Sequence, residues 1–347
     1  MAGESRIARV EAVPYALPFD GPYVTARGRL ERREMVLLRL RGEDGHEGLG
    51  EAVPLSLRGG GSSLGEVRRE LEDSAGEPHE GLSPPARAAV EVARLDLEAR
   101  RLGVPLWRAL GAESAAPVIC NATLVAGPPT AVAADAERWA ARGFSTFKLK
   151  VGVPGDVGQV QAVREALGHE ARIRVDANGT WSPEEAVLRL TAMERHGIEL
   201  AEQPAADLED LALVNAQTAI PLAADESVAT PADAERAMQM DACQLATVKL
   251  AKVGGVVPAR TIAATIPTYL SSALDGPVGI AAAAHTAQVL APAGPPPGLA
   301  HGLATQLLFA ETIASVQSEV REGLLHLPEG PGLGVEIDES ALRRHQI

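Results

Sequence analysis

Cysteine, aromatic residues and long apolar runs are all scarce in this chain, and each scarcity narrows what the protein can be. Two cysteines, Cys120 and Cys243, are too few for a disulfide framework. We expect both to be small buried residues, in a cytoplasmic protein. Aromatic residues make up 3% of the 347 positions, so the core must rest on alanine, valine and leucine. No apolar run approaches the roughly 18–20 residues that span a bilayer, and the N-terminal segment lacks the apolar stretch of a signal peptide.

Positive charge is also in short supply. The chain carries 32 basic and 46 acidic residues, a formal net charge of −14. This balance argues against a nucleic acid or an anionic membrane as partner. With 46% hydrophobic and 22% charged residues, the composition is that of a globular protein, and the length suggests about two domains.

Lysine is the scarcest of the basic residues. The chain has four lysines, Lys148, Lys150, Lys249 and Lys252, against 28 arginines. Lysine can lose its proton when burial or a neighbouring cation lowers its pKa, whereas arginine stays protonated. The pair in TFKLKVG, residues 146–152, therefore predicts a site that moves a proton. Lys252 is expected to lie on the surface.

The first part of the chain reads as a small α+β unit. Strands are expected in residues 6–19 and 34–52, the second interrupted by a turn at residues 43–46. Residues 19–33 and 50–63 are rich in glycine, and both are expected to be loops. Helical apolar spacing follows in residues 65–76 and 83–103.

From residue 118 onward, eight short apolar segments alternate with helices whose first residues are typical caps, such as Thr130, Ser182 and Thr230. This pattern predicts an α/β fold of the (β/α)8 or TIM-barrel type, with a doubly wound sheet as the alternative. The least regular unit is the seventh, because the helical segment before its strand is short. Residues 323–338 look like strand, turn and strand.

Polar residues recur where successive strands end. The steps between them are 26, 26, 23 and 24 residues, one βα unit each. In a barrel such residues share the mouth at the C-terminal ends of the strands, where active sites lie. The strand-end residues are Lys150, Asp176, Glu202, Asp225 and Lys249, and the two-residue period of a strand adds Lys148, Arg174 and Asn178 as inward neighbours.

Three stepped carboxylates without histidine or cysteine form a hard-oxygen site that suits Mg²⁺ or Mn²⁺. The alternative is that each carboxylate caps a helix or pairs with arginine. A metal with an amine on each side suits removal of a proton α to a carboxylate, through an enediolate that the metal stabilises. We expect Lys150 to be the base, with its pKa lowered by Lys148 and the metal. Lys249 would return the proton or stay charged beside the intermediate.

The chain carries the motifs KLK (148–150), RVDAN (174–178), AEQP (201–204), ADES (224–227) and VKLAKVGG (248–255). Together they resemble the enolase superfamily, and specifically its muconate-lactonizing-enzyme subgroup, over essentially the whole chain. The resemblance implies Mg²⁺ on Asp176, Glu202 and Asp225, with Lys150 and Lys249 as the acid/base pair. It implies three parts: a capping domain over 1–115 with two active-site loops, a barrel over 116–320, and a segment over 321–347 that packs back on the capping domain. Glu226 would lie next to the metal ligands without binding the metal itself.

The last strands of the barrel separate the reactions of this subgroup. Dipeptide epimerases resemble one another in an Asp-x-Asp at the eighth strand, and muconate cycloisomerases tend to have an acidic residue there. This chain reads HGLAT at 301–305, which together with LSSALDGPVGIA at 270–281 resembles o-succinylbenzoate synthase. That resemblance implies dehydration of a succinyl-hydroxycyclohexadiene carboxylate in menaquinone biosynthesis. Ser271, Ser272 and the backbone near Gly279 would then face the succinyl carboxylate of this small-molecule substrate.

Other interpretations stay open. An N-succinylamino acid or N-acylamino acid racemase comes next, then a dipeptide epimerase or a muconate cycloisomerase, all isomerases. A barrel without catalysis, or a Schiff-base aldolase, would belong to another class. We expect a structural role for His301, whereas Arg174 either points at a substrate carboxylate or pairs with an acidic neighbour. The oligomeric state is open, and a homo-oligomer remains compatible with the sequence.

Overall fold

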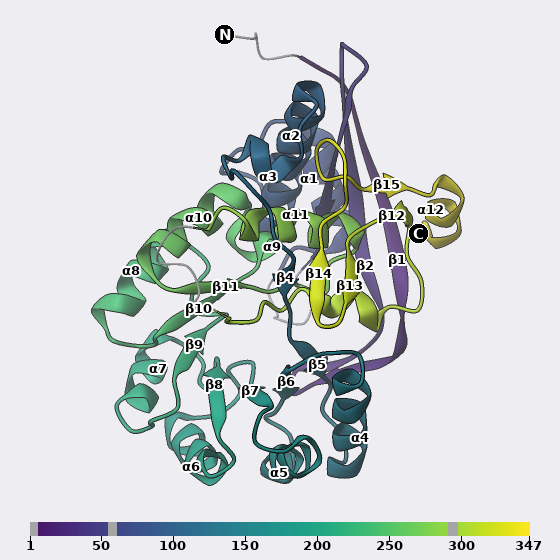
Figure 1. Ribbon diagram of the computed structural model, residues 1–347. Helices are drawn as coiled ribbons and strands as arrows, with labels where there is room; N and C mark the ends of the chain where they lie inside the picture. The colour runs from purple at the N-terminus through teal and green to yellow at the C-terminus, as the bar shows by residue number, and fades with distance from the viewer. Residues whose placement is uncertain (1–5, 55–60, 291–297) are drawn as a thin grey trace.

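The computed structural model describes residues 6–54, 61–290 and 298–347. An antiparallel sheet stands along one side of a barrel of parallel strands and outer helices (Figure 1). The predicted fold class, a TIM-type barrel with an N-terminal α+β unit, is confirmed.

The N-terminal sheet is dominated by one long hairpin. β1 (Ile7–Thr25) pairs with β2 (Gly28–Gly42), and β3 (Glu47–Ala52) pairs with the other edge of β2. The pairing continues to Thr25 opposite Gly28, with a register shift between Pro18 and Tyr23. The expected loop at 19–33 is therefore wrong: the ladder hydrogen bonds outweigh the glycine and arginine content. The predicted turn at 43–46 is confirmed. Of the second expected loop, residues 50–63, the first three residues belong to β3, and residues 55–60 lie outside the described residues.

The two faces of this sheet are buried against different partners. On β2, the side chains of Val36, Leu38 and Leu40 pack against two helices, α1 (Leu64–Asp73) and α2 (Pro84–Leu102). The alternate residues, beginning with Met35 and Leu37, belong to the larger core that continues into the barrel. Residues of odd number on β2 therefore point at the barrel.

Glycine allows α2 to approach β3 closely. A Cβ on Gly48 or Gly50 would lie 2.0 Å from the carbonyl oxygen of Ala93 or Ala89, respectively. A side chain at either position would push the helix off the sheet.

The barrel strands form a seven-stranded parallel sheet in the order β11-β10-β9-β8-β7-β6-β5. The expected eighth strand at 299–305 is reduced to two bridges, which pair His301 with Cys120 and Gly302 with Ser271. These bridges connect the first and last strands and close the ring. The strands are β5 (Ala122–Leu124), β6 (Thr146–Lys150), β7 (Arg172–Asp176), β8 (Ile198–Glu202), β9 (Leu222–Ala224), β10 (Leu245–Val248) and β11 (Thr268–Leu270).

The helices around the ring begin largely where their caps predict. Ser182 caps α6 and Thr230 caps α8 through their side-chain oxygens, whereas α4 begins at Pro129, so Thr130 is not its cap. The helices are α3 (Leu106–Ala109), α4 (Pro129–Ala140), α5 (Asp156–Leu167), α6 (Pro183–Glu194), α7 (Leu208–Asn215), α8 (Pro231–Gln239), α9 (Leu250–Val253), α10 (Val256–Thr265) and α11 (Pro277–Ala287). None of the helices in the described ranges has the length and apolar character to cross a bilayer.

The end of the chain returns to the N-terminal sheet. The backbone N–H of Ile347 donates to the carbonyl of Pro14, 3.2 Å away, and the yellow α12 lies beside β1 in Figure 1. We propose the division at residues 115 and 320 as the domain organisation. The C-terminal elements are η2 (Ala304–Leu308), β12 (Ala314–Val316), β13 (Glu319–Arg321), β14 (Leu324–His326), which pairs with β4 (Val118–Ile119), β15 (Glu336–Ile337) and α12 (Glu339–His345).

Candidate active site

The parallel register brings the predicted strand-end residues together. Lys150 on β6 lies opposite Asp176 on β7, and Asp176 lies opposite Glu202 on β8. Asp225 follows β9 and Lys249 follows β10, the next two strands of the sheet. The three carboxylate side chains have no exposed surface, so their charges depend on the groups around them.

Lysine ammonium groups neutralise these carboxylates. Lys148 Nζ donates to both oxygens of Glu202 at 2.8 Å and lies 2.9 Å from Asp176 Oδ2. Lys150 Nζ lies 2.6 Å from the same Asp176 oxygen, and Lys249 Nζ lies 2.5 Å from Asp225 Oδ2. The result is two neighbouring clusters, Lys148 and Lys150 with Asp176 and Glu202, and Lys249 with Asp225.

These clusters shift the affinity of each group for protons. Burial lowers the pKa of Lys150, but the negative charges of Asp176 and, to a lesser extent, of Tyr23 and Glu202 act against burial, and the net pKa is raised. Lys148 opposes this rise, the direction expected for a neighbouring cation. Burial raises the pKa of Glu202, and the charge of Asp176 adds to it. The lowered pKa that Lys150 needs as a base therefore requires neutralisation of Asp176 by something other than Lys150.

Asn178 connects the lysine to the rest of the site. Its backbone has φ of 51°, a left-handed conformation that asparagine tolerates. This places its Oδ1 3.2 Å from Lys150 Nζ and its Nδ2 3.2 Å from Glu226 Oε1. Arg27 Nε donates to its carbonyl at 2.8 Å, so the N-terminal hairpin reaches the barrel mouth here.

The donor set fits a divalent cation in its chemistry. Among the described residues, no three His, Cys, Asp or Glu side chains are arranged as they stand to hold a metal. Lysine ammonium groups lie against the same carboxylate oxygens. Asp176, Glu202 and Asp225 are nevertheless buried all-oxygen donors at the ends of neighbouring strands, the ligand type that Mg²⁺ prefers. Asp176, Glu202 and Asp225 are therefore the residues that would hold Mg²⁺.

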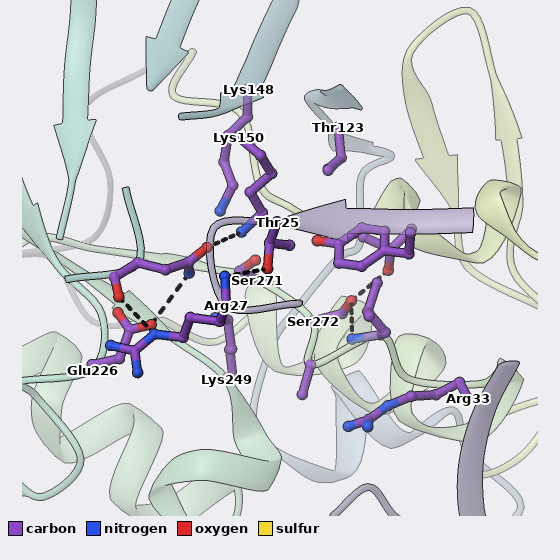
Figure 2. A pocket seen from close by; sticks show the side chains of 15 residues that line it. Thr25, Arg27, Arg33, Thr123, Lys148, Lys150, Glu226, Lys249, Ser271 and Ser272 are labelled. Atoms are coloured by element: carbon purple, nitrogen blue, oxygen red, sulfur yellow. Dashed lines mark hydrogen bonds between the residues drawn. The ribbon is translucent and has the colours of Figure 1, made fainter. Parts of the chain in front are cut away.

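A cavity opens above these two clusters, and both parts of the chain line it. In Figure 2, Glu226 and Arg27 lie at one end, and Arg33 lies on the side of Ser272. Three lysines line the space between. The lining residues are Tyr23, Thr25, Arg27, Arg33, Thr123, Lys148, Lys150, Asn178, Glu226, Lys249, Ser271, Ser272, Ala273, Leu274 and Thr305.

Comparison with known proteins agrees with this arrangement. Residues 131–341 match the family model described as "Enolase C-terminal domain-like". The chain belongs to the enolase superfamily. Within it, the relatives place the chain in the muconate-lactonizing-enzyme subgroup. One is the L-Ala-D/L-Glu epimerase of Bacillus subtilis, 34% identical over 81% of this chain and 85% of that protein. Another is muconate cycloisomerase 1 of Rhodococcus opacus, 34% identical over 74% of this chain and 71% of that protein.

Solved structures of superfamily enzymes match the whole fold. Muconate lactonizing enzyme from Pseudomonas fluorescens, complexed with muconolactone, has a TM-score of 0.91 and 29% identity over 99% of this chain and 100% of that one. Dipeptide epimerase from Enterococcus faecalis, complexed with Mg and L-Leu-L-Tyr, has a TM-score of 0.88 and 27% identity over 95% and 99%. These relatives are isomerases that bind small molecules.

Lys252 differs from its expected place in this enolase-superfamily site. The prediction of a surface lysine is wrong: its side chain is 4% exposed. The four-residue helix α9 turns Lys252 back beneath the end of β10. There Nζ donates to Asp225 Oδ1 at 2.9 Å, to the carbonyl of Thr247 at 2.9 Å and to the carbonyl of Asp225. Lys252 therefore binds one carboxylate oxygen of Asp225, and Lys249 binds the other.

Arg174 and His301 are buried inside the barrel and are not among the residues that line the cavity. Arg174 Nε donates to Glu199 Oε2 at 2.5 Å, and its guanidinium lies over the ring of Tyr269, so the acidic-neighbour interpretation holds. His301 Nδ1 accepts from the backbone N–H of Leu270 at 3.0 Å. Burial lowers the pKa of His301 to about 4, so it is neutral and structural.

Gly279 also lies outside the main cavity. It lines a smaller one behind Ser271, together with Glu51 and Asp275. The N–H groups at the start of α11 are already used, because Gly276 N and Val278 N donate to Glu51 at 2.6 and 3.3 Å. These two N–H groups are therefore occupied by a side chain of the protein itself, and a contact between the backbone near Gly279 and a substrate anion stays a prediction.

Several residues of the site escaped the sequence prediction. Tyr269 donates to Glu202 Oε2 at 2.5 Å and lies two residues before Ser271 on the inward side of β11. Strand alternation could have found Tyr269. Arg27, Arg33 and Glu51 come from the N-terminal sheet, and their approach to the barrel mouth depends on packing between distant segments.

Proposed function

We propose that the protein is an isomerase that removes the proton α to a carboxylate of a small substrate. A proton then returns to the opposite face of the same carbon, as in racemisation, or the enediolate expels the ring oxygen of a lactone from the β-carbon. The observation that carries this proposal is the placement of two lysines. Lys150 and Lys249 come from the strands that flank the three carboxylate-bearing strands, and both line the same cavity. A substrate between them would meet an amine on each face.

The side chains divide the work as follows. Asp176, Glu202 and Asp225 would hold Mg²⁺, which would stabilise the negative charge of an enediolate. Lys150, oriented by Asn178, takes the α-proton once Asp176 is neutralised. Lys148 stays protonated against Glu202 and lowers the proton affinity of Lys150. Lys249 returns a proton on the opposite face.

The lining residues favour a substrate without a free ammonium group. Among the described residues of the cavity wall, Glu226 alone bears a carboxylate, and it already accepts from Asn178. Residues 301–305 lack the Asp-x-Asp that the resemblance associates with dipeptide epimerases. A lactone acid of the muconolactone type or an N-acylamino acid therefore fits better than a dipeptide.

Dehydration of the o-succinylbenzoate synthase type is the second candidate. It is supported by the hydroxyl groups at the end of the barrel, where Ser272 and Thr305 are hydrogen-bonded and both line the cavity. Dehydration would need Lys150 as base and acid, with Lys249 remaining a cation.

The test is a substrate panel with Mg²⁺ in D₂O: muconolactone, N-succinyl-L-phenylalanine and succinyl-hydroxycyclohexadiene carboxylate. Conversion of muconolactone or racemisation with deuterium uptake supports the isomerase. Rapid formation of the aromatic product alone assigns the dehydratase. Inertness toward all three, with no deuterium exchange, would refute the proposed proton abstraction.

Two lysine variants separate these reactions. Lys150→Ala should lower kcat for any member of the panel about 10²- to 10⁴-fold, since it removes the base. Lys249→Arg keeps the charge but cannot exchange a proton, so racemisation should be lost while dehydration persists. Equal collapse of both activities in Lys249→Arg would contradict the assigned roles.

A further inference from the structure

We infer that Tyr269 is a positioning residue of the proposed metal site, where it holds the carboxylate of Glu202 in the orientation that a divalent cation needs. The inference rests on the proposed function and deepens it, because Glu202 is one of the three carboxylates that would hold Mg²⁺. Tyr269 is not among the residues that line the cavity, so it acts through Glu202 and not through contact with a substrate.

The fold directs Tyr269 across the interior of the barrel. Tyr269 lies on β11, whereas Glu202 ends β8, and two other strands, β10 and β9, stand between them in the sheet. The hydroxyl of Tyr269 nevertheless donates to Glu202 Oε2 at 2.5 Å. Neither side chain has exposed surface. The hydrogen bond is therefore made inside the closed ring, where water does not compete for either group.

A second hydroxyl fixes the direction of this hydrogen bond. Thr247 on β10 lies opposite Tyr269 in the register of the two strands, and its Oγ1 donates to the Tyr269 hydroxyl at 2.7 Å. A hydroxyl has one proton and can accept as well as donate. Since the tyrosine oxygen accepts from Thr247, its own proton is left for Glu202. The two hydroxyl groups thus form a chain that ends on the carboxylate.

The ring of Tyr269 is held as firmly as its hydroxyl. The guanidinium carbon of Arg174 lies 5.1 Å from the centroid of the ring. Arg174 is itself fixed, because Nε donates to Glu199 Oε2 at 2.5 Å and Nη1 donates to the carbonyl of Ala300 at 2.7 Å. The ring also belongs to a small buried apolar cluster of the barrel interior. Packing therefore sets the ring, and the ring sets the position of the hydroxyl.

The contact with Tyr269 makes the two oxygens of Glu202 unequal. Lys148 donates to both oxygens, and Tyr269 donates to Oε2 alone. Among the residues that the structure describes, Oε2 therefore has two donors and Oε1 has one. Each carboxylate oxygen accepts about two hydrogen bonds, so Oε1 keeps more capacity for a cation. Mg²⁺ demands near-ideal geometry of its ligands, and a fixed carboxylate meets this demand better than a rotating one.

The experiment removes the hydroxyl and keeps the ring. The metal-free wild type and Tyr269→Phe are titrated with MgCl₂ in a calorimeter. The Kd for Mg²⁺ should rise about 10- to 100-fold in the variant, the usual effect of losing a group that orients a metal ligand. Thr247→Val is the second variant, and it also covers the case in which Tyr269→Phe does not fold. It keeps the tyrosine but removes the donor that directs its proton, so the Kd should rise about 2- to 10-fold.

The matched control is Tyr15→Phe. Tyr15 is as fully buried as Tyr269, and its hydroxyl also donates to a carboxylate, Glu51 Oε2, at 2.8 Å. Glu51 is not one of the three proposed metal ligands. Both tyrosine variants should lower the midpoint of urea unfolding in EDTA, because each leaves a buried carboxylate short of a donor. Tyr15→Phe should nevertheless keep the Kd for Mg²⁺ within about 2-fold of the wild type, since a purely structural loss does not reorient Glu202.

Two results would overturn the role of Tyr269 but leave the proposed proton abstraction intact. One is an unchanged Kd for Mg²⁺ in whichever of Tyr269→Phe and Thr247→Val folds. The other is an equal rise of the Kd in Tyr15→Phe. If the wild type binds no Mg²⁺, the metal site and this role are both wrong, and if the D₂O panel also shows no exchange, the proposed function itself is overturned.

Discussion

At the scale of single residues, the site is defined by lysines that are buried rather than exposed. All four lysines of the chain are at most 7% exposed, and all four contact Asp176, Glu202 or Asp225. A chain that otherwise uses arginine has placed lysine where a compact ammonium must fit between carboxylates. Three of these lysines line the cavity, and the fourth, Lys252, supports Asp225 from behind.

Lys252 should matter for stability. Lys252→Met leaves Asp225 Oδ1 and two carbonyl groups without their ammonium donor in a fully buried place. Breaking a buried pair on one side costs about 3 kcal/mol, which urea unfolding with EDTA present would measure. Arg260→Met removes a cation from the exposed side of α10 and should change the free energy of unfolding by less than about 0.5 kcal/mol. If both variants changed the free energy of unfolding equally, the buried contacts of Lys252 would contribute no more to stability than an exposed cation does.

At the scale of elements, Glu51 joins the N-terminal sheet to the barrel. It lies on β3, accepts from the start of α11 and from Tyr15 at 2.8 Å, and fills the space left by Gly276, where a Cβ would lie 2.7 Å from its carboxylate. The Glu51 carboxylate thus binds two of the N–H groups at the start of α11 and connects β1, β3 and α11.

Glu51 should also make the stability of the folded protein depend on pH. Burial and then Asp275 raise the pKa of Glu51 to about 7 from 4.5, so the folded protein binds this proton more tightly than the unfolded chain. The stabilisation is complete below about pH 4.5 and is lost as the pH rises through about 7, by at most about 3 kcal/mol. The free energy of unfolding of the wild type, measured relative to Glu51→Gln, should therefore fall between pH 5 and pH 8.

The control is Glu47→Gln, a change of the same kind on the same strand at a partly exposed position. Its free energy of unfolding should follow the wild-type pH profile within about 0.5 kcal/mol. Parallel profiles for the wild type and Glu51→Gln would contradict the raised pKa.

Elements also explain which parts of the site could be predicted from the sequence. The spacing of Asp176, Glu202 and Asp225 follows directly from one βα unit per step, so periodicity alone indicated that they meet. Lys252 could not be found this way, because the direction of its side chain depends on the single turn of α9. Arg33 was hidden by the interpretation of residues 19–33 as a loop. As a strand, the same residues place Arg33 on the face of Met35.

At the scale of the whole molecule, two separate parts of the chain build one cavity. The barrel supplies the lysines and carboxylates, whereas β1 and β2 supply Tyr23, Arg27 and Arg33. We therefore propose that the barrel carries the chemistry and that the N-terminal sheet contacts the rest of the substrate.

Mg²⁺ should also stabilise the folded protein against unfolding. The lysines compensate the carboxylates in the metal-free protein, so we expect it to unfold cooperatively, and a cation that binds the folded state alone should add stability. At 100 times its Kd, Mg²⁺ adds about 2.7 kcal/mol, a rise of about 5 °C in Tm by calorimetry. Asp225→Asn should lose most of this rise, because it removes one ligand charge. Asp241→Asn, on the exposed outside of the barrel, should keep it. An equal rise in both variants would show that Mg²⁺ binds elsewhere, and no rise in the wild type would remove the metal from the proposed mechanism.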